Sequence, residues 1–445
     1  MKIRIFKTHC LVDLFLFFSL VSGLKSGTHP GFRVIGRTLY DKCGEKVILR
    51  GVANPNIWYQ RDGMPQFEEI EMTGANVIRI VWNTTGLAND LDAAIWNCID
   101  LSMIPMIECH DATCDLGLLD EVVDYWTRSD IADVIIDHEA YLLLNIANEA
   151  GDYATTATAF RNAYETAILR LREADIHVPL VIDGPDCGKK IDILQSEGPY
   201  LIGVDPDSNL IFSVHMWWNQ KTGYPEAKIK QEIEQSVSMN LPLIVGEFGC
   251  WFDWDGTEVT PETTIPYLTI IEQCHLNGIG YIAWSWFGND TPILDMTTDG
   301  TYETLHDWGL EVAVTSEYSI QNTSVRPYFI DYGRCNPSGI HFSREKGTPE
   351  LFSFTPNFPN PFNPRTQIDY RLSDTANVRL DVFDEIGRYV VNLINEKQTP
   401  GSHSIHWKGK DDTGKQVPSG TYICRIQVIN DSHSIHRFQK MILVK

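Results

Sequence analysis

Two glutamate residues each close a long apolar segment of this sequence. Glu149 ends the run LLLNIANE, and Glu247 ends the run LPLIVGE. A single glutamate in such a place is most often the start of a loop or a helix cap. Two carboxyl groups held about 5 Å apart, however, are what the retaining hydrolysis of a glycosidic bond requires. That chemistry needs a fold that brings the two run ends together.

Several other polar or aromatic residues occupy similar places, at or near the ends of apolar runs. They are Arg79, His110, Asn148, His215, Trp217 and Trp284. Trp58 follows the first run at a short distance. Taken singly, each has an ordinary structural role, such as half of an ion pair or a packed ring. Their convergence on one site would instead favour catalysis.

The two glutamates would take different parts in the reaction. Glu247 has to be ionised to attack the anomeric carbon of a sugar, and a neighbouring Arg79 would lower its pKa. Glu149 has to carry a proton at first, give it to the leaving oxygen and later accept one from water. Asn148 offers an amide to the sugar hydroxyl beside the reacting carbon. We therefore expect Glu149 to be the acid/base and Glu247 the nucleophile.

The histidines and indoles would bind rather than react. His110 and His215 would hold the carboxylates or sugar hydroxyls. Indole rings pack well against the apolar faces of pyranose rings. The expected stacking partners are Trp284, Trp58, Trp217, Trp218 and Trp251.

Eight short apolar runs are candidates for the strands that position these residues. They are 47–54, 75–82, 104–110, 141–149, 178–184, 210–217, 242–249 and 278–286. Their nearly continuous apolar character is typical of parallel strands covered on both faces. Between them lie amphipathic segments that predict helices, for example 67–73, 90–100, 118–125, 159–174 and 227–239.

This alternation, over roughly 240 residues, predicts an α/β fold of the (β/α)8 TIM-barrel type. In such a barrel the active site lies at the carboxyl ends of the strands, where the polar residues above are found. A doubly wound open sheet usually carries a glycine-rich phosphate loop after its first strand. The first run here ends in GVANPN at 51–56, without that motif. The barrel is preferred.

The amino-terminal residues have the pattern of a signal peptide. Lys2, Arg4 and Lys7 precede an apolar stretch at 11–24, followed by small residues. The stretch is too short and interrupted for a good membrane span. We expect a signal peptide at 1–27, no stable membrane span and a secreted or cell-surface protein.

Charge and cysteine content exclude some partners. The formal net charge of −23 repels phosphate backbones, so no nucleic acid is expected as a partner. Ten cysteines are present, two of which, Cys109 and Cys114, flank His110 and Asp111. Their spacing matches no zinc pattern, so a local disulfide or buried thiols are preferred. We expect no metal and no cofactor.

The barrel pattern spans residues 28–314 and then stops. Residues 315–350 are mixed and are expected to be a linker. Residues 351–445 contain short alternating runs separated by turns, which predict a small all-β, immunoglobulin-like sandwich. The expected strands are 367–372, 377–383, 389–394, 403–407, 422–428 and 436–444.

At its strand ends the chain resembles glycoside hydrolase family 5, whose two catalytic glutamates lie on strands four and seven. The stretches that carry the resemblance are GANVIRIVW, ECHDAT, VDYW, LLLNIANE, FSVHM, LIVGEFG and YIAWSWFGN, within about residues 31–313. They are similar to the bacterial β-mannanase and cellulase branch. The resemblance implies a retaining endo-β-1,4-glycanase acting on plant cell-wall polysaccharide. It assigns Glu149 and Glu247 as above, with Arg79, His110, Asn148, His215 and Trp284 as binding residues.

Two departures bear on the substrate. The family usually places a tyrosine two residues after the strand-six histidine, where its hydroxyl supports the nucleophile, but this chain has Trp217. Either another group, such as Tyr224, supplies that contact or the cleft differs. After Glu149 the chain has AGD, where mannanases tend to carry an aromatic residue. Mannan is the first expectation and glucan the alternative, ahead of a non-catalytic carbohydrate-binding barrel. An esterase would carry G-x-S-x-G, which is absent.

The carboxyl-terminal region resembles the sorting domains of type IX secretion. The matching features are NFPNPFNP, VFDEIGR, SGTY and the closing KMILVK. The resemblance implies secretion machinery as a partner. A carbohydrate-binding or spacer sandwich is the alternative, but Trp407 is the only tryptophan of this region, which favours sorting.

Overall fold

The computed structural model describes residues 31–253, 258–335, 352–354, 357, 359–372, 375–384, 388–429 and 434–444. The expected signal peptide at 1–27 lies outside these residues, as do residues 336–350 of the expected linker. The chain divides into two compact units, Met1–His341 and Phe342–Lys445. Among the described residues, no helix has the length and apolar character needed to cross a membrane.

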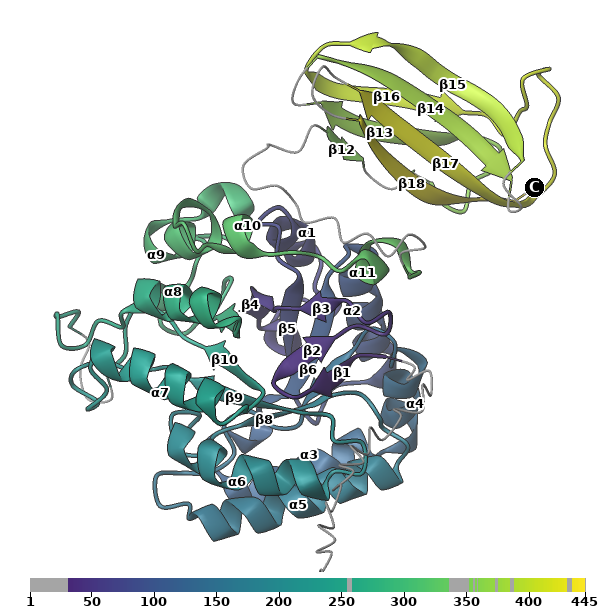
Figure 1. Ribbon diagram of the computed structural model, residues 1–445. Helices are drawn as coiled ribbons and strands as arrows, with labels where there is room; N and C mark the ends of the chain where they lie inside the picture. Colours follow the sequence, from purple (N-terminus) through teal and green to yellow (C-terminus); the bar gives the residue numbers. More distant parts are fainter. Residues whose placement is uncertain are drawn as a thin grey trace, which may run out of the picture. The chain divides into compact units, whose positions relative to one another are not determined.

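Eight parallel strands of the first unit close into a barrel in the order β10-β11-β4-β5-β6-β7-β8-β9 (Figure 1). These strands are β4 Arg50–Asn54, β5 Val77–Trp82, β6 Ile104–Cys109, β7 Leu143–Asn145, β8 Leu180–Asp183, β9 Leu210–His215, β10 Leu243–Glu247 and β11 Gly280–Ala283. Every residue in them is buried, which explains their unbroken apolar runs. The predicted barrel is confirmed.

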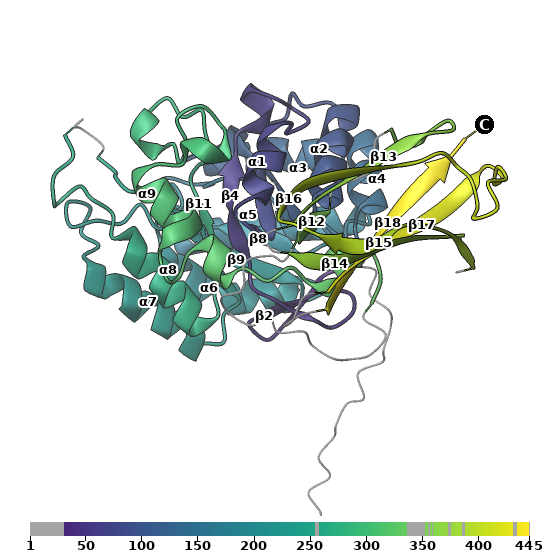
Figure 2. The ribbon, with the colours of Figure 1, turned by 90° about the horizontal axis from the view of Figure 1, so that it is seen from above.

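Helices cover the outside of the barrel. They are α1 Gln66–Glu71, α2 Ala88–Asp100, α3 Leu119–Trp126, α4 Ser129–Asp137, α5 Ala157–Glu173, α6 Ile191–Val204, α7 Glu226–Ser238, α8 Tyr267–Asn277, α9 Asp307–Leu310, α10 Ile320–Thr323 and α11 Tyr328–Tyr332. α5 begins where Thr156 accepts a hydrogen bond from the Ala159 amide. α8 ends at Gly278, whose positive φ of 65° suits a helix terminus. α7 and α8 lie side by side in both views (Figure 2).

The apolar side chains of a small antiparallel sheet pack against the side chains that fill the amino-terminal part of the barrel interior. Its strands are β1 Arg33–Ile35, β2 Thr38–Tyr40 and β3 Lys46–Val47. The segment after the barrel also folds onto this unit as far as Cys335. Arg326 donates to Glu71 Oε1 at 2.7 Å, and a disulfide joins Cys335 to Cys43. Part of the segment expected as a linker is therefore helical and packed.

The second unit is a β-sandwich of two antiparallel sheets, ordered β12-β13-β16 and β15-β14-β17-β18. Its strands are β12 Phe352–Phe354, β13 Thr366–Leu372, β14 Ala376–Asp384, β15 Tyr389–Gln398, β16 Gly401–Trp407, β17 Gly420–Ile429 and β18 Ser434–Leu443. β12 is additional to the six strands expected. Trp407 is buried against Phe362 and Tyr422, so its ring belongs to the core of this unit. The predicted all-β class is confirmed.

Candidate active site

Arg79 is the centre of the polar cluster inside the carboxyl end of the barrel. It lies on β5 and is almost fully buried. Its Nη1 donates to Glu247 Oε1 at 2.6 Å, and its Nη2 donates to Asn148 Oδ1 at 2.7 Å. Nη2 also lies 3.5 Å from Asp183 Oδ2. One guanidinium group thus fixes side chains at or just after the ends of three different strands.

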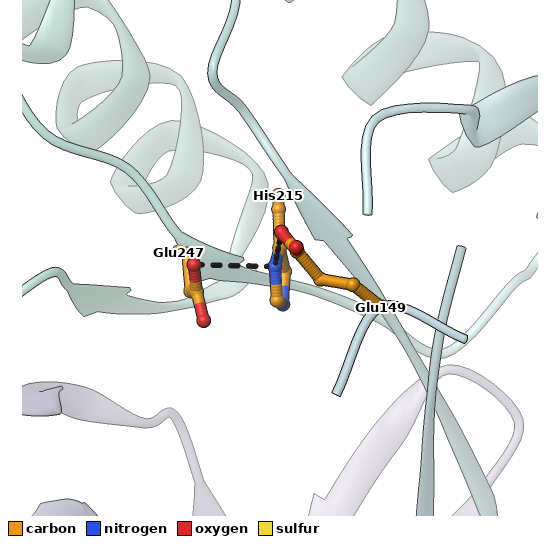
Figure 3. Close-up of side chains that lie close together, drawn as sticks. All are labelled: Glu149, His215 and Glu247. Atoms are coloured by element: carbon orange, nitrogen blue, oxygen red, sulfur yellow. Dashed lines mark hydrogen bonds and ion pairs between the residues drawn. The ribbon is translucent and has the colours of Figure 1, made fainter. Parts of the chain in front are cut away.

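The imidazole of His215 lies between the two glutamates (Figure 3). Its Nδ1 is 2.7 Å from Glu149 Oε1 and 3.3 Å from Glu247 Oε2. One oxygen of each glutamate and a ring nitrogen of His215 all lie within 4.8 Å of one another. The carboxyl groups are therefore about as close as the roughly 5 Å typical of retaining glycoside hydrolases. The expected pairing of Glu149 with Glu247 is present in the fold.

The charges of this cluster favour an ionised Glu247 and a protonated His215. Burial alone would raise the pKa of Glu247, but attraction to His215 and Arg79 outweighs it and holds the pKa below its usual range. Burial would lower the pKa of His215, but Glu247 and Asp183 raise it well above its ordinary value. Burial also opposes ionisation of Asp183, yet His215 and Arg79 lower its pKa to about 2. An ionised Glu247 is what a nucleophile needs.

Glu149 leaves β7 with an unusual backbone. Its φ is 49°, in the left-handed region, which for a residue other than glycine costs about 1–3 kcal/mol. Its amide donates to Asp183 Oδ2 at 3.2 Å, and its carbonyl accepts from the amide of Cys114 at 3.0 Å. The surrounding loops therefore hold the conformation that directs this side chain toward His215.

Trp217 occupies the place where the family usually has tyrosine, and it contacts the nucleophile itself. Its indole Nε1 donates to Glu247 Oε2 at 3.3 Å. Tyr224, the alternative donor, stacks on Trp218 with ring centroids 4.6 Å apart. The indole N–H thus makes a hydrogen bond of the kind expected from the missing phenol. Because Trp217 is buried, its ring is not a broad platform for a sugar.

His110, Trp58 and Trp284 form an aromatic group, and the Trp284 ring centroid lies 5.9 Å from the guanidinium carbon of Arg79. The rings of His110 and Trp284 stack at 5.4 Å, and Trp58 meets His110 edge-on at 5.2 Å. His110 Nδ1 lies 2.9 Å from a Glu108 oxygen. Burial would lower the pKa of His110, but Glu108 raises it above its ordinary value. Trp58 is 53% exposed and Trp284 half-buried, so both rings remain available to a sugar.

Two other expected stacking residues do not fit that role. Trp218 is fully buried, and its indole N–H donates to the carbonyl of Lys189 at 3.2 Å. Trp251 is also buried, and its N–H donates to the carbonyl of Glu258 at 3.2 Å. Both rings pack inside loops, which sequence position alone does not reveal.

Several residues of the cluster were not predicted from the sequence. Asp183 ends β8 and bonds the Glu149 amide, and Glu108 lies two residues before His110. Asn145 accepts two hydrogen bonds from Arg79, each 3.1 Å long. Asn289 accepts the indole N–H of Trp284 at 2.7 Å. The position of Asp183 at a strand end was a usable signal, whereas Asn289 lies in a loop without one.

The atoms of Glu149, His215 and Glu247 are close enough together to share a cation. A metal-binding imidazole has to be neutral, however, and neighbouring carboxylates raise the pKa of His215 well above its ordinary value. Arg79 already places a positive charge 2.6 Å from Glu247. The charge of this site thus suits acid/base chemistry better than metal binding.

Cys109 and Cys114 do not form the local disulfide considered above. Cys114 pairs with Cys187, 73 residues away, and Cys109 is a buried thiol. The pairing brings together two loops that follow β6 and β8. Sequence spacing gave no indication of it.

Cleavage of a glycosidic bond needs an ionised carboxylate and a second carboxyl group that transfers a proton, on opposite sides of the bond. A parallel barrel that holds such a pair at its carboxyl end has the architecture of a glycosidase. The chain belongs to that class, and comparison with known proteins defines its family.

The chain belongs to glycosyl hydrolase family 5: residues 40–290 match the family described as cellulase. A mannan endo-1,4-beta-mannosidase of Salipaludibacillus agaradhaerens is 32% identical over 305 residues, covering 66% of this chain and 94% of the relative. One from Cellvibrio japonicus is 31% identical, covering 66% and 68%. Residues 363–432 match the FlgD Ig-like domain family.

Solved structures agree with this assignment. A mannohexaose complex of a Thermomonospora fusca beta-mannanase superimposes with a TM-score of 0.59 and 30% identity, covering 66% of this chain and 98% of that one. A beta-mannanase of Streptomyces thermolilacinus gives a TM-score of 0.61 at 28% identity, covering 67% and 99%. The similarity thus extends over nearly the whole of each of those chains.

Proposed function

We propose that this protein is a secreted, retaining endo-β-1,4-mannanase. The observation that carries the proposal is the pair Glu149 and Glu247, whose oxygens lie within 4.8 Å at the carboxyl end of the barrel. The names of the family 5 relatives described above favour mannan as the substrate. The exposed ring of Trp58 and the half-buried ring of Trp284 suit a polysaccharide chain.

In the first step Glu247 attacks the anomeric carbon while Glu149 gives its proton to the departing glycosidic oxygen. The carbon–oxygen bond breaks and a covalent glycosyl–enzyme ester forms. In the second step Glu149, now a carboxylate, takes a proton from water, whose oxygen attacks the same carbon. The ester bond breaks, Glu247 is released as a carboxylate, and the configuration at the carbon is retained.

The residues around Glu247 serve this cycle by their hydrogen bonds and, for Arg79 and His215, by their charge. Arg79 and Trp217 each donate a hydrogen bond to one of its oxygens, which stabilises the ionised form before attack. Asn148, held by Arg79 at 2.7 Å, is placed to meet the hydroxyl next to the reacting carbon. His215 lies between both glutamates and limits their mutual repulsion.

A β-1,4-glucan is the alternative substrate, and two features favour it. Residues 40–290 match a family described as cellulase. The loop after Glu149 carries Ala150 and Gly151 in place of a large side chain.

The deciding experiment compares reducing-sugar release by the purified full chain on galactomannan, glucomannan and carboxymethyl-cellulose. Activity on both mannans and none on carboxymethyl-cellulose is the expected result. The reverse preference would make the protein a glucanase. A fully folded protein that is silent on all three would overturn the proposal.

The secretory part of the proposal rests on the two ends of the sequence. The first 27 residues have a signal-peptide pattern, and the carboxyl-terminal motifs resemble type IX sorting domains. The Ig-like match and the β-sandwich are compatible with a separate sorting module. We expect residues 351–445 to carry a periplasmic reporter to the surface of a bacterium with that system. Equal export by a host lacking the system would contradict this role.

A further inference from the structure

The disulfide between Cys114 and Cys187 lies beside the acid/base residue. Cys114 follows β6 and Cys187 follows β8, and their Cα atoms are 4.6 Å apart. Glu149 follows β7, the strand between these two in the barrel. The disulfide therefore connects the loops on either side of the one that carries Glu149.

Both halves of this disulfide hold the backbone around Glu149. The amide of Cys114 donates to the carbonyl of Glu149 at 3.0 Å, and the amide of Cys187 donates to the carbonyl of Gly151 at 3.0 Å. Thr113 and Ala150 form an antiparallel bridge between these bonds. The short segment 149–151 is thus fixed from two sides by two residues that are covalently joined.

The same loops contact the neighbours of Glu149. The carbonyl of Gly188 accepts from the amide of His215 at 2.9 Å, and Thr113 Oγ1 accepts from Asn148 Nδ2 at 2.9 Å. Separation of the two loops would release the Glu149 backbone and these two partners together. Without the disulfide, only non-covalent contacts would oppose that separation.

We propose that Cys114 and Cys187 are positioning residues of the reaction, whose disulfide keeps the Glu149 carboxyl group in line with the leaving oxygen. The inference rests on the proposed function and extends it to these two residues. Glu149 has a left-handed φ of 49°, a conformation that its surroundings have to maintain. A misplacement of about 1 Å can cost a hundredfold in rate, so a covalent connection at this point affects catalysis directly.

The test measures how strongly kcat/KM of two double variants depends on the leaving group of the substrate. Cys114→Ser/Cys187→Ser removes this disulfide, and Cys43→Ser/Cys335→Ser removes the one that joins the loop before β3 to the end of the barrel unit. Substrates are the phenyl and the dinitrophenyl β-mannobiosides, or the cellobiosides if the enzyme is a glucanase. A phenyl leaving group needs the proton of Glu149, whereas dinitrophenolate departs without it.

For Cys114→Ser/Cys187→Ser we expect kcat/KM on the phenyl glycoside to fall about tenfold or more relative to the dinitrophenyl glycoside. KM should change little. The Cys43→Ser/Cys335→Ser control should keep the wild-type ratio even if its melting temperature falls. An unchanged ratio in Cys114→Ser/Cys187→Ser, whether activity is kept or is lost equally on both substrates, would overturn the positioning role. A wild-type enzyme inactive on every glycoside would instead overturn the proposed function.

A second measurement covers the case in which Cys114→Ser/Cys187→Ser does not fold. Cys114 and Cys187 are both partly exposed, so a phosphine reductant can reach them in the folded protein. The Cys43→Ser/Cys335→Ser variant is treated with the reductant, and thiol mass labelling confirms cleavage of the remaining bridge. The ratio of kcat/KM on the phenyl glycoside to that on the dinitrophenyl glycoside should fall on reduction and recover on reoxidation. A constant ratio after complete reduction would contradict the proposal.

Discussion

The two catalytic candidates differ in how their carboxyl groups are held. Glu247 is bound at both oxygens, Oε1 by Arg79 and Oε2 by Trp217. Glu149 Oε1 contacts His215, whose pKa is raised by the surrounding carboxylates. The hydrogen bond from the Arg79 guanidinium favours an ionised Glu247, which suits its attack on the sugar. The hydrogen bonds from Arg79 and Trp217 thus distinguish Glu247 from Glu149, in line with the different roles expected from the sequence.

Replacing each glutamate should give a different defect. We expect Glu247→Gln to abolish measurable hydrolysis of every substrate, because no nucleophile remains. Glu149→Gln should lower kcat/KM on polysaccharide on the order of a thousandfold but spare kcat/KM on the dinitrophenyl glycoside, whose leaving group needs no proton. Its kcat on the dinitrophenyl glycoside should still fall, because the second step has lost its base. Steady-state kinetics on both substrates measure the difference. Glu121→Gln, an exposed carboxylate on α3, is the control. Full activity in either catalytic variant would refute the assignment.

The indole of Trp217 offers a second prediction at the residue scale. Trp217→Phe keeps an aromatic ring but removes the N–H that donates to Glu247, a charged acceptor. Loss of such a bond should lower kcat roughly tenfold to a hundredfold. Trp217→Tyr, which restores a donor, should recover part of this loss. Kinetics on the preferred mannan check the series, and equal activity of the Phe and Tyr variants would show that the hydrogen bond is unimportant.

At the scale of elements, the loop between β8 and α6 packs directly on His215. Gly188 has a φ of +78°, and a Cβ added there would lie 2.5 Å from the His215 ring. Gly223 has a similar φ of +83°, but a Cβ there would meet nothing within 4 Å. The two glycines thus share a backbone conformation that would strain any other residue, and they differ in whether an added Cβ would meet the site.

We expect Gly188→Ala to reduce kcat at least about tenfold, because His215 or the loop has to move. Gly223→Ala should lower only stability, by about 1 kcal/mol, through the left-handed backbone conformation. Activity assays and thermal unfolding of both variants separate the two effects. Similar kcat values in the two variants would show that contact with His215 does not matter.

The strands were predictable because burial on both faces leaves an apolar run that needs no knowledge of distant residues. The hydrogen-bonded strands end earlier than the apolar runs of the sequence do. β7 stops at Asn145, so Asn148 and Glu149 belong to the following loop. The contact of Trp217 with Glu247 and the Cys114–Cys187 bridge were not predictable, since both depend on loop paths. Asp183 had the same strand-end signal as Glu247 and could have been found.

At the scale of the whole molecule, the site and the sandwich belong to separate units. Every residue of the polar cluster lies in the first unit, Met1–His341. Each unit also has a hydrophobic core of its own. Catalysis should therefore not depend on the second unit.

We accordingly expect a chain ending at residue 341 to keep kcat and KM on soluble mannan within about twofold, a change of less than about 0.5 kcal/mol in activation free energy. The full chain is the control, and circular dichroism confirms that the shortened protein is folded. A large loss of kcat in a folded barrel would assign the sandwich a part in the site.

The buried charges also determine how stability depends on pH. His110 and His215 have raised pKa values in the folded state, so their contribution is complete below the unfolded pKa of about 6.5 and declines as pH rises through the folded values. Glu247 and Asp183 have lowered pKa values, so theirs is complete above about pH 4.5 and is lost as pH falls. Stability should therefore be highest between about pH 4.5 and 6.5.

Thermal unfolding measured from pH 3 to 10 should show a decline on each side of that window. Glu108→Gln tests the alkaline side, because Glu108 is the main group that raises the pKa of His110. This variant should lose less stability than the wild type between pH 6.5 and the alkaline end, since one of the two histidine contributions is then absent. A wild-type melting temperature that still rises above pH 7, or a Glu108→Gln curve parallel to it, would show that these buried charges do not govern folding.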